Sequence, residues 1–137
     1  MPDHEPQEQF DYTKMLAQAG PYPLEAYSFV REGLSYTMQR VHENVDDLED
    51  FERHVDGRQL CLGLRDFAID QYGLLAPVVL SHWSIFRTDD FGRIVFAMIN
   101  AGLMSRSTKD TLEDFRSVFD FGEAFSEDQL LQCVSSN

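Results

Sequence analysis

Two carboxylates on one predicted helix are the best candidates in this chain for acid–base chemistry. Asp66 and Asp70 lie four residues apart, so a helix carries both on one face, where each shifts the other's pKa if the pair is buried. Arg65 and Arg58 are near enough in sequence to neutralise them. A structural ion-pair network is therefore favoured over an acid–base site. The residues that a binding site could use are Asp66, Asp70, His82 and Arg93.

The ion-pair network leads to a specific expectation. Arg65, Asp66, Asp70 and Arg93 lie on predicted helices with apolar neighbours on both sides. Some of these charges must then point partly inward, and a partly buried charge requires a partner. We expect the four side chains to form ion pairs inside or at the rim of a helical core. His82, beside the only tryptophan, is expected to be partly buried and hydrogen-bonded.

Other arrangements that support chemistry do not occur in the sequence. His42, His54 and His82 lack the spacing that holds metal ligands on one face. There is no glycine-rich phosphate loop and no GxSxG elbow. Cys61 lies among leucines, where burial raises the pKa of a thiol and makes it unreactive. The sequence therefore predicts no catalytic residue, no metal and no cofactor.

Charge restricts the classes of partner. The chain has 24 acidic against 11 basic residues, a formal net charge of −13. Nucleic acids and anionic membranes require a basic surface, so both are disfavoured. Acidic residues are concentrated between positions 43 and 52 and again in the C-terminal fifth. Such runs are usually solvated linkers or faces, and the alternative is a docking surface for a basic partner.

Length and composition predict one soluble domain. The 137 residues, 43% hydrophobic and with eleven phenylalanines, suffice for a real core. We expect a disordered leader over residues 1–10 and a single helical domain over 11–137, with an acidic linker near 43–53. The two cysteines lack CxxC spacing, and neither a signal peptide nor a membrane-length apolar run is recognised. A cytoplasmic protein with reduced thiols is expected.

Helix signals cover most of the chain. A short helix is predicted over 11–20, and a long amphipathic one follows Pro23. Asp56 and Gln59 have the form of a capping box for a further helix, which Gly73 ends. Residues 74–83 predict a mostly buried helix with Pro77 in its first turn. The apolar stripe of the long helix is Leu24, Tyr27, Val30, Leu34, Met38 and Val41.

The next segment decides the fold class. Thr88 is the predicted N-cap of a helix that Gly102 ends. Two short alternating runs, over 103–107 and 115–119, then predict a β-hairpin. The result is a mainly α fold with a C-terminal hairpin, which is winged-helix-like. The alternative is an all-α bundle in which 115–125 is another helix, and Ser126 with Gln129 caps a last short helix.

Several runs also resemble a known family. These are RQLCLGLRDFAIDQYG (58–73), DDFGRIVF (89–96) and AGLMS (101–105), within a region from about Tyr22 to Phe125. They are similar to a family of small bacterial proteins found mainly in planctomycetes and verrucomicrobia, for which no activity is established. The resemblance implies a bacterial, cytoplasmic protein. No catalytic residue carries over.

The function predicted from these features is a non-enzymatic protein–protein interaction module. It would bind another protein through an acidic face and a few exposed aromatic side chains. One alternative is a winged-helix-type regulator associated with nucleic acid. Against it, the predicted helix that would enter the major groove begins with two carboxylates, Asp89 and Asp90. A second alternative is an enzyme with a carboxylate/arginine site. We further predict that the two best-capped helices share a core containing Leu64, Phe67, Phe91, Ile94, Val95 and Met98.

Overall fold

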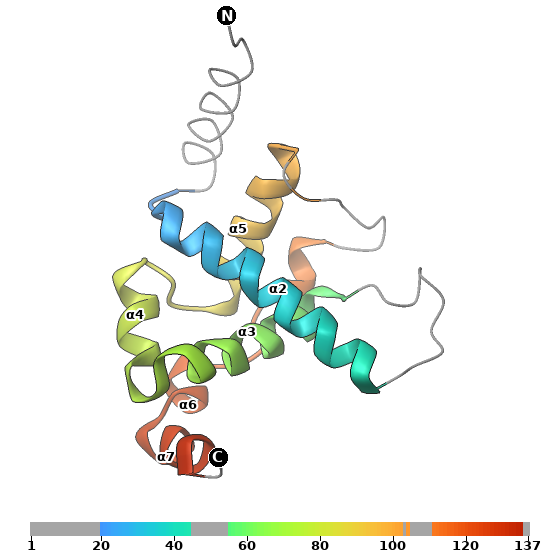
Figure 1. The fold of residues 1–137 in the computed structure, drawn as a ribbon. Coiled ribbons are helices and arrows are strands. Elements are labelled where there is room, and N and C mark those ends of the chain that lie inside the picture. The colour runs from blue at the N-terminus through green and yellow to red at the C-terminus, as the bar shows by residue number, and fades with distance from the viewer. Residues whose placement is uncertain (1–19, 45–54, 103, 105–110, 136–137) are drawn as a thin grey trace, which may run out of the picture.

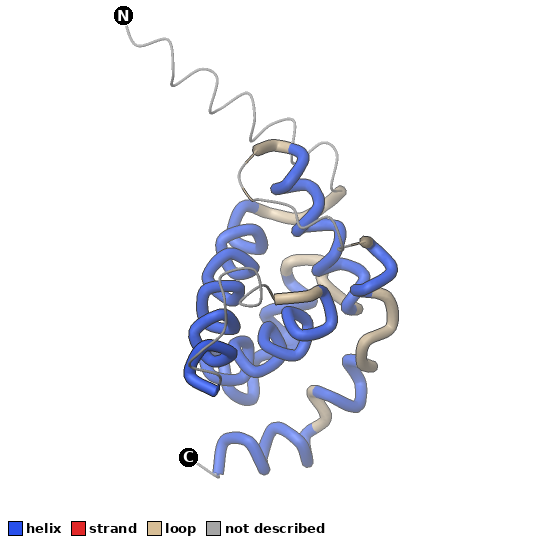
Figure 2. Tube along the Cα trace, turned by 90° about the vertical axis from the view of Figure 1, so that its right-hand side faces the viewer, coloured by secondary structure: helices blue, strands red, loops and turns tan. Residues whose placement is uncertain are grey.

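The computed structural model describes residues 20–44, 55–102, 104 and 111–135, and every regular element in these ranges is a helix (Figures 1 and 2). The mainly α expectation is confirmed. The predicted helix over 11–20, the leader and the acidic linker lie outside the described residues. The elements are α2 Leu24–Asn44, α3 Gly57–Tyr72, η2 Gly73–Leu75, α4 Ala76–His82, α5 Thr88–Asn100, η3 Leu112–Phe115, α6 Phe121–Ala124 and α7 Glu127–Ser135.

The predicted C-terminal hairpin is wrong, and the all-α alternative fits. Residues 112–115 form the 3-10 helix η3, and Ser117 has a φ of 49°, which breaks an extended run. The backbone groups that a partner strand would pair are taken by Thr88, whose hydroxyl accepts from Val118 N and donates to Phe115 O. Most of the first predicted strand, 103 and 105–107, lies outside the described residues. The winged-helix-like topology is lost with the hairpin.

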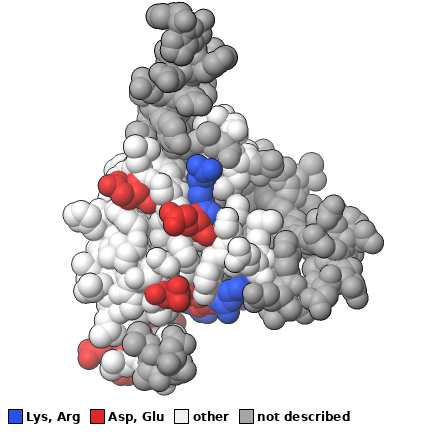
Figure 3. All heavy atoms as spheres, in the orientation of Figure 1, with Lys and Arg blue, Asp and Glu red and all other residues white. Residues whose placement is uncertain are grey.

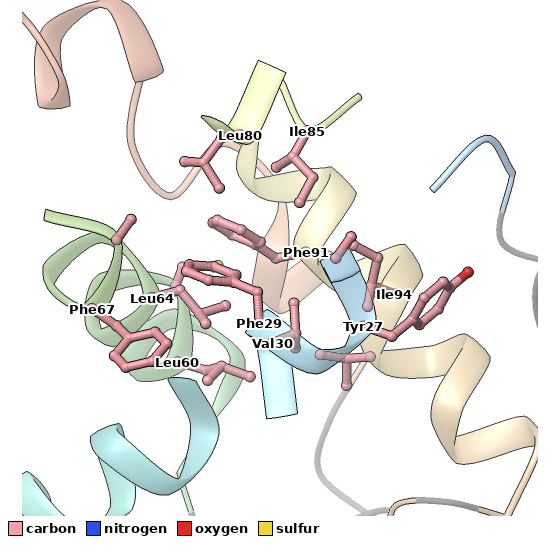
Figure 4. Close-up of a cluster of buried hydrophobic side chains, with 14 of the residues drawn as sticks. Tyr27, Phe29, Val30, Leu60, Leu64, Phe67, Leu80, Ile85, Phe91 and Ile94 are labelled. Carbon is pink, nitrogen blue, oxygen red and sulfur yellow. The ribbon is translucent and has the colours of Figure 1, made fainter. Parts of the chain in front are cut away.

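The core lies where α2 crosses α3 and α5, and α4 closes one side of it (Figures 1 and 4). The α2–α3 crossing is close because Gly33 lies against Leu64 and Gly63 lies against Thr37, with no room for a Cβ atom at either glycine. The Thr37 hydroxyl donates to Gly33 O at 2.7 Å and so needs no partner from α3. Close packing of these two helices fixes the residues that face outward beside the crossing. All six predicted core residues are buried: Leu64, Phe67, Phe91, Ile94, Val95 and Met98.

The predicted stripe of α2 is only partly correct. Tyr27 and Val30 are buried, but Leu24 is 50% exposed, and Phe29, outside the predicted stripe, is buried. The buried face is wider than one stripe because α3 and α5 contact α2 on different sides. Leu34, Met38 and Val41 are partly buried.

Local capping signals predicted several of the helix ends. Gln59 N donates to Asp56 Oδ1 at 2.7 Å and Asp56 N to Gln59 Oε1 at 3.1 Å, which confirms the capping box. Gly73 ends α3 with a φ of 54°. Gly102, with a φ of 79°, follows α5, and its N–H bonds to the carbonyl of Ile99. Before α7, Gln129 N donates to Ser126 Oγ at 3.3 Å, half of the predicted box.

The helix predicted over 74–83 is not mostly buried. It divides into η2 and α4, with Pro77 in the first turn of α4 as expected. Only Ala76 and Leu80 are buried, whereas Leu74, Leu75 and Val78 are 50%, 63% and 60% exposed. One face of this segment packs on the core and the other meets solvent. Over the described ranges, no helix combines the length and apolar character needed to cross a bilayer.

Candidate functional site

The four residues nominated from the sequence occupy different surroundings. Asp66 accepts from Arg40 at 3.0 Å and from Arg65 Nε at 3.0 Å, at the surface of the α2–α3 pair. Exposed Asp70 accepts from Gln71 at 3.3 Å. His82 ends α4 and is exposed, not partly buried as expected, because α4 turns only its Ala76–Leu80 face to the core.

The expected ion pairs form at Arg65, Asp66 and Arg93 but not as one network, and Asp70 forms none with a described residue. Arg65 pairs with Asp66, and Arg93 pairs with Asp90, each at 3.0 Å. Asp66 borders a hollow of about 210 Å³ beside Thr37 and Gly63, and Arg93 borders another of about 210 Å³ against η3. Neither of these hollows contains a second member of the nominated four. The enzyme alternative gains no shared pocket from this arrangement.

A buried carboxylate that the sequence analysis did not nominate organises the start of α5. Asp90 accepts from Tyr22 Oη at 2.5 Å and from Arg93 at 3.0 Å through one oxygen. Its other oxygen accepts from the backbone N–H groups of Phe86 at 2.8 Å and Arg87 at 3.1 Å. Burial and the bond to Asp90 raise the pKa of Tyr22 to about 12. Every oxygen of this carboxylate is thus occupied within the fold, so Asp90 serves structure.

Thr88 is not the N-cap that the sequence predicts. It is the first residue of α5 and fully buried, and its hydroxyl links α5 to the segment that follows η3. It donates to Phe115 O at 2.6 Å and accepts from Val118 N at 3.0 Å. Asp90, at the third position of the helix, instead binds the free N–H groups before α5. We call Asp90 with Tyr22, Thr88 and Arg93 the α5 hub.

A different kind of site lies between α2, α3 and the end of α4. A hollow of about 380 Å³ opens there, which is within the size range of ligand sites. Phe29 and Phe67 are buried beneath it, with ring centroids 5.3 Å apart. Half-buried Trp83 stands 5.5 Å from Phe29 and 6.0 Å from Tyr72. We call this the aromatic groove, lined by Leu24, Glu25, Ser28, Phe29, Glu32, Phe67, Gln71, Tyr72 and Trp83.

The turn after α4 fixes the position of the tryptophan. Trp83 N donates to Leu80 O at 3.1 Å, and Ser84 adopts a φ of 65°, which reverses the chain. Ile85 N then donates to the same carbonyl at 2.9 Å, and the Ile85 side chain is buried. Anchors on both sides therefore hold Trp83 against the groove.

The charges that line the groove are all negative. Glu25 and Glu32 lie on its α2 edge, and its lining contains no lysine or arginine. Neither glutamate side chain forms a hydrogen bond or ion pair with any described residue. In Figure 3, both acidic and basic side chains appear on the face that α2 crosses. The negative charge of the groove therefore comes from its own lining residues and not from that face as a whole.

Part of this groove could have been recognised from sequence. Glu25, Ser28 and Glu32 recur at spacings of three and four, which places a polar line on one face of α2. Phe29 lies within that line, and a large apolar side chain is not expected on a face that only contacts solvent. The contribution of Trp83 could not have been recognised, because it depends on how α4 folds back onto α3.

Other reactive groups are accounted for by burial. Cys61 is fully buried, and desolvation raises the pKa of its thiol, as expected from its leucine neighbours. Cys133 is half-buried and is not part of a disulfide. Among the described residues, no group of histidine, cysteine, aspartate and glutamate side chains is arranged to hold a metal ion. The side chains of His42 and His54 are outside the described set.

Comparisons of the chain with protein-family models, with curated proteins and with solved structures yield no match. The resemblance to the planctomycete and verrucomicrobial family therefore stays an expectation.

Proposed function

We propose that this chain is a non-enzymatic protein-interaction module that binds a segment of a partner protein in the aromatic groove. The observation that carries the proposal is a hollow of about 380 Å³ where the half-buried rings of Tyr72 and Trp83 lie beside carboxylates that have no partner among the described residues. Aromatic side chains supply large contact areas at little entropic cost and dominate protein interfaces. Unpaired glutamates at the edge give such an interface its charge preference.

The same features guide the choice of partner class. A net charge of −13 and an acidic groove disfavour nucleic acid and anionic lipid. The nominated residues Asp66, Asp70, His82 and Arg93 lie apart, so an enzyme is not proposed. The absence of a disulfide at Cys61 and Cys133, together with the family resemblance, supports a cytoplasmic, bacterial module.

The experiment uses a photo-cross-linking amino acid at two matched positions. Ser28 lines the groove, and Ser35, seven residues later on α2, is also exposed but lies outside the lining. The two variants are irradiated in native extract, and the cross-linked peptides are sequenced. We expect a specific partner peptide from position 28 and background from position 35.

A follow-up with purified components confirms the site. The cross-linked partner segment is synthesised and titrated while the emission of Trp83, the only tryptophan, is recorded. Saturable change in that emission supports the proposal. Equal cross-linking at both positions, or a partner segment that binds without affecting Trp83, contradicts it.

A further inference from the structure

We infer that the groove recognises a basic amphipathic helix whose two cationic side chains lie seven residues apart, with an apolar side chain between them. This inference rests on the proposed function and specifies its partner. The cations would meet Glu25 and Glu32, and the apolar side chain would enter the hollow over Phe29 and Phe67.

The spacing follows from α2. Glu25 and Glu32 are seven residues apart on one helix, which is nearly two turns, or about 10.5 Å along the axis. The two residues therefore point in nearly the same direction. A helix lying alongside α2 presents its own residues i and i+7 with the same separation. Two basic residues at that spacing can pair with both glutamates at once, whereas residues at i and i+4 span only about 6 Å.

The interior of the groove selects the middle residue. Phe29 and Phe67 are buried beneath the hollow, and Tyr72 and Trp83 form its aromatic wall. A hollow of about 380 Å³ admits one large apolar side chain. On a helix, residue i+3 or i+4 lies between i and i+7 on the same face, so it is aimed at the hollow. An aromatic or leucine anchor there would bury apolar area against four rings.

Charge complementarity identifies the flanking residues as cations. The groove lining contains two carboxylates and no positive group, and neither carboxylate is neutralised by a described residue. An acidic or neutral segment would leave both unpaired at the contact. Arginine suits these positions because its guanidinium also stacks on aromatic faces such as the exposed part of Trp83.

The described fold favours a helix over an extended segment. An extended peptide gains affinity by adding to a sheet edge, and the described ranges contain no strand. A helix brings its backbone hydrogen bonds with it and needs only side-chain contacts from its site. The edge formed by α2 offers such contacts along two turns.

The test uses synthetic peptides and Trp83 emission. The probe peptide contains no tryptophan or tyrosine, is lactam-bridged on its outer face to keep it helical, and carries arginines at i and i+7 with phenylalanine at i+4. One comparison peptide replaces both arginines by citrulline, which keeps the shape and removes the charge. A second moves the arginines to i and i+11 with unchanged composition, and a third replaces the phenylalanine by alanine.

We expect the probe to bind roughly tenfold more tightly than the citrulline peptide at low salt, because two exposed ion pairs are lost. The difference should shrink as salt increases. Glu32→Gln should reduce probe affinity several-fold and leave citrulline-peptide affinity unchanged. Glu113→Gln, an exposed glutamate on η3 outside the groove, is the matched control and should leave both affinities unchanged.

The outcomes separate this inference from the proposed function. If the citrulline peptide or the i,i+11 peptide binds as tightly as the probe, the charge-and-spacing inference is wrong, while groove binding itself stands. If the peptide with alanine in place of phenylalanine binds as tightly as the probe, the hollow does not select an apolar anchor, and the inference also fails. If no peptide changes Trp83 emission, the inference is overturned, and the fate of the proposed function is decided independently by cross-linking at Ser28 against Ser35.

Discussion

The α5 hub and the aromatic groove treat their polar groups in opposite ways. In the hub, Asp90 is buried and both its oxygens accept hydrogen bonds from inside the fold. In the groove, the carboxylates of Glu25 and Glu32 are exposed beside aromatic rings and bond to no described residue. A buried charge must be satisfied internally, whereas an unpaired charge beside an apolar hollow is available to a ligand. The comparison therefore distinguishes a residue that stabilises the fold from residues that can bind.

Asp90→Ala should cause the largest loss of stability. It removes the acceptor for Tyr22, Arg93 and two backbone N–H groups, so the free energy of unfolding should fall by about 3–5 kcal/mol. Urea denaturation followed by circular dichroism measures it. Glu25→Gln is the matched control in the groove and should change stability by less than about 0.5 kcal/mol. Comparable losses in both variants would remove the distinction between the two regions.

Thr88→Val should have the next largest effect. The substitution keeps the shape of the buried side chain but leaves Phe115 O and Val118 N without their partner. We expect a loss of about 2–3 kcal/mol and faster hydrogen exchange at Val118. Thr88→Ser keeps the hydroxyl and should retain the slow exchange. Unchanged exchange in the valine variant would mean that Thr88 does not hold the C-terminal segment.

Gly63→Ala should weaken peptide binding in the aromatic groove and leave the α5 hub intact. A Cβ atom at this position would overlap the Thr37 side chain where α2 crosses α3, so α2 must shift, at a cost of about 1–3 kcal/mol. Because α2 carries one edge of the groove, peptide affinity should fall too. The Asp90 hydrogen bonds should persist, as reported by the Phe86 amide in exchange measurements. Gly122→Ala, whose added Cβ meets only the Asp120 carboxylate, is the control.

Local signals in the sequence predicted the helices better than they predicted the site. Capping residues such as Asp56 and Gly73 act within a few positions of the chain, so their pattern determines the helix ends. The hairpin prediction failed because the hydroxyl of Thr88, which is distant in sequence, binds the backbone of residues 115 and 118. Alternation alone could not reveal that competitor.

The aromatic groove could be predicted only in part, for a related reason. Asp66 and Asp70 were nominated as charges on one face of a helix, but α3 exposes Asp70 and leaves Asp66 at the surface. Glu25 and Glu32 gain their significance only when Trp83 and Phe67 arrive from elsewhere in the chain. Which carboxylate stays unpaired depends on tertiary contacts and cannot be deduced from spacing.

Tyr27→Phe should have the smallest effect at neutral pH and the opposite sign. The Tyr27 hydroxyl is the one fully buried side-chain polar atom among the described residues without a hydrogen-bond partner, and in Figure 4 it points away from the labelled core side chains. Unlike the Asp90 oxygens, this hydroxyl loses its hydrogen bonds to water on folding and gains none from the described residues. Its removal should therefore leave stability unchanged or raise it by up to about 1 kcal/mol at pH 7.

The same variant has a distinct alkaline signature. Burial raises the pKa of Tyr27 from 10.0 to about 12, so between these values the unfolded phenol loses its proton while the folded one keeps it. The stability present below pH 10 is then lost as the pH rises towards 12, with a slope of up to about 1.4 kcal/mol per pH unit. Tyr22 behaves likewise, and its slope remains in the variant. Urea denaturation from pH 7 to 11.5 should show Tyr27→Phe declining less steeply than wild type. Parallel curves would mean that this hydroxyl ionises as freely in the fold as in water, and that it is not the unsatisfied counterpart of the Asp90 hydrogen bonds.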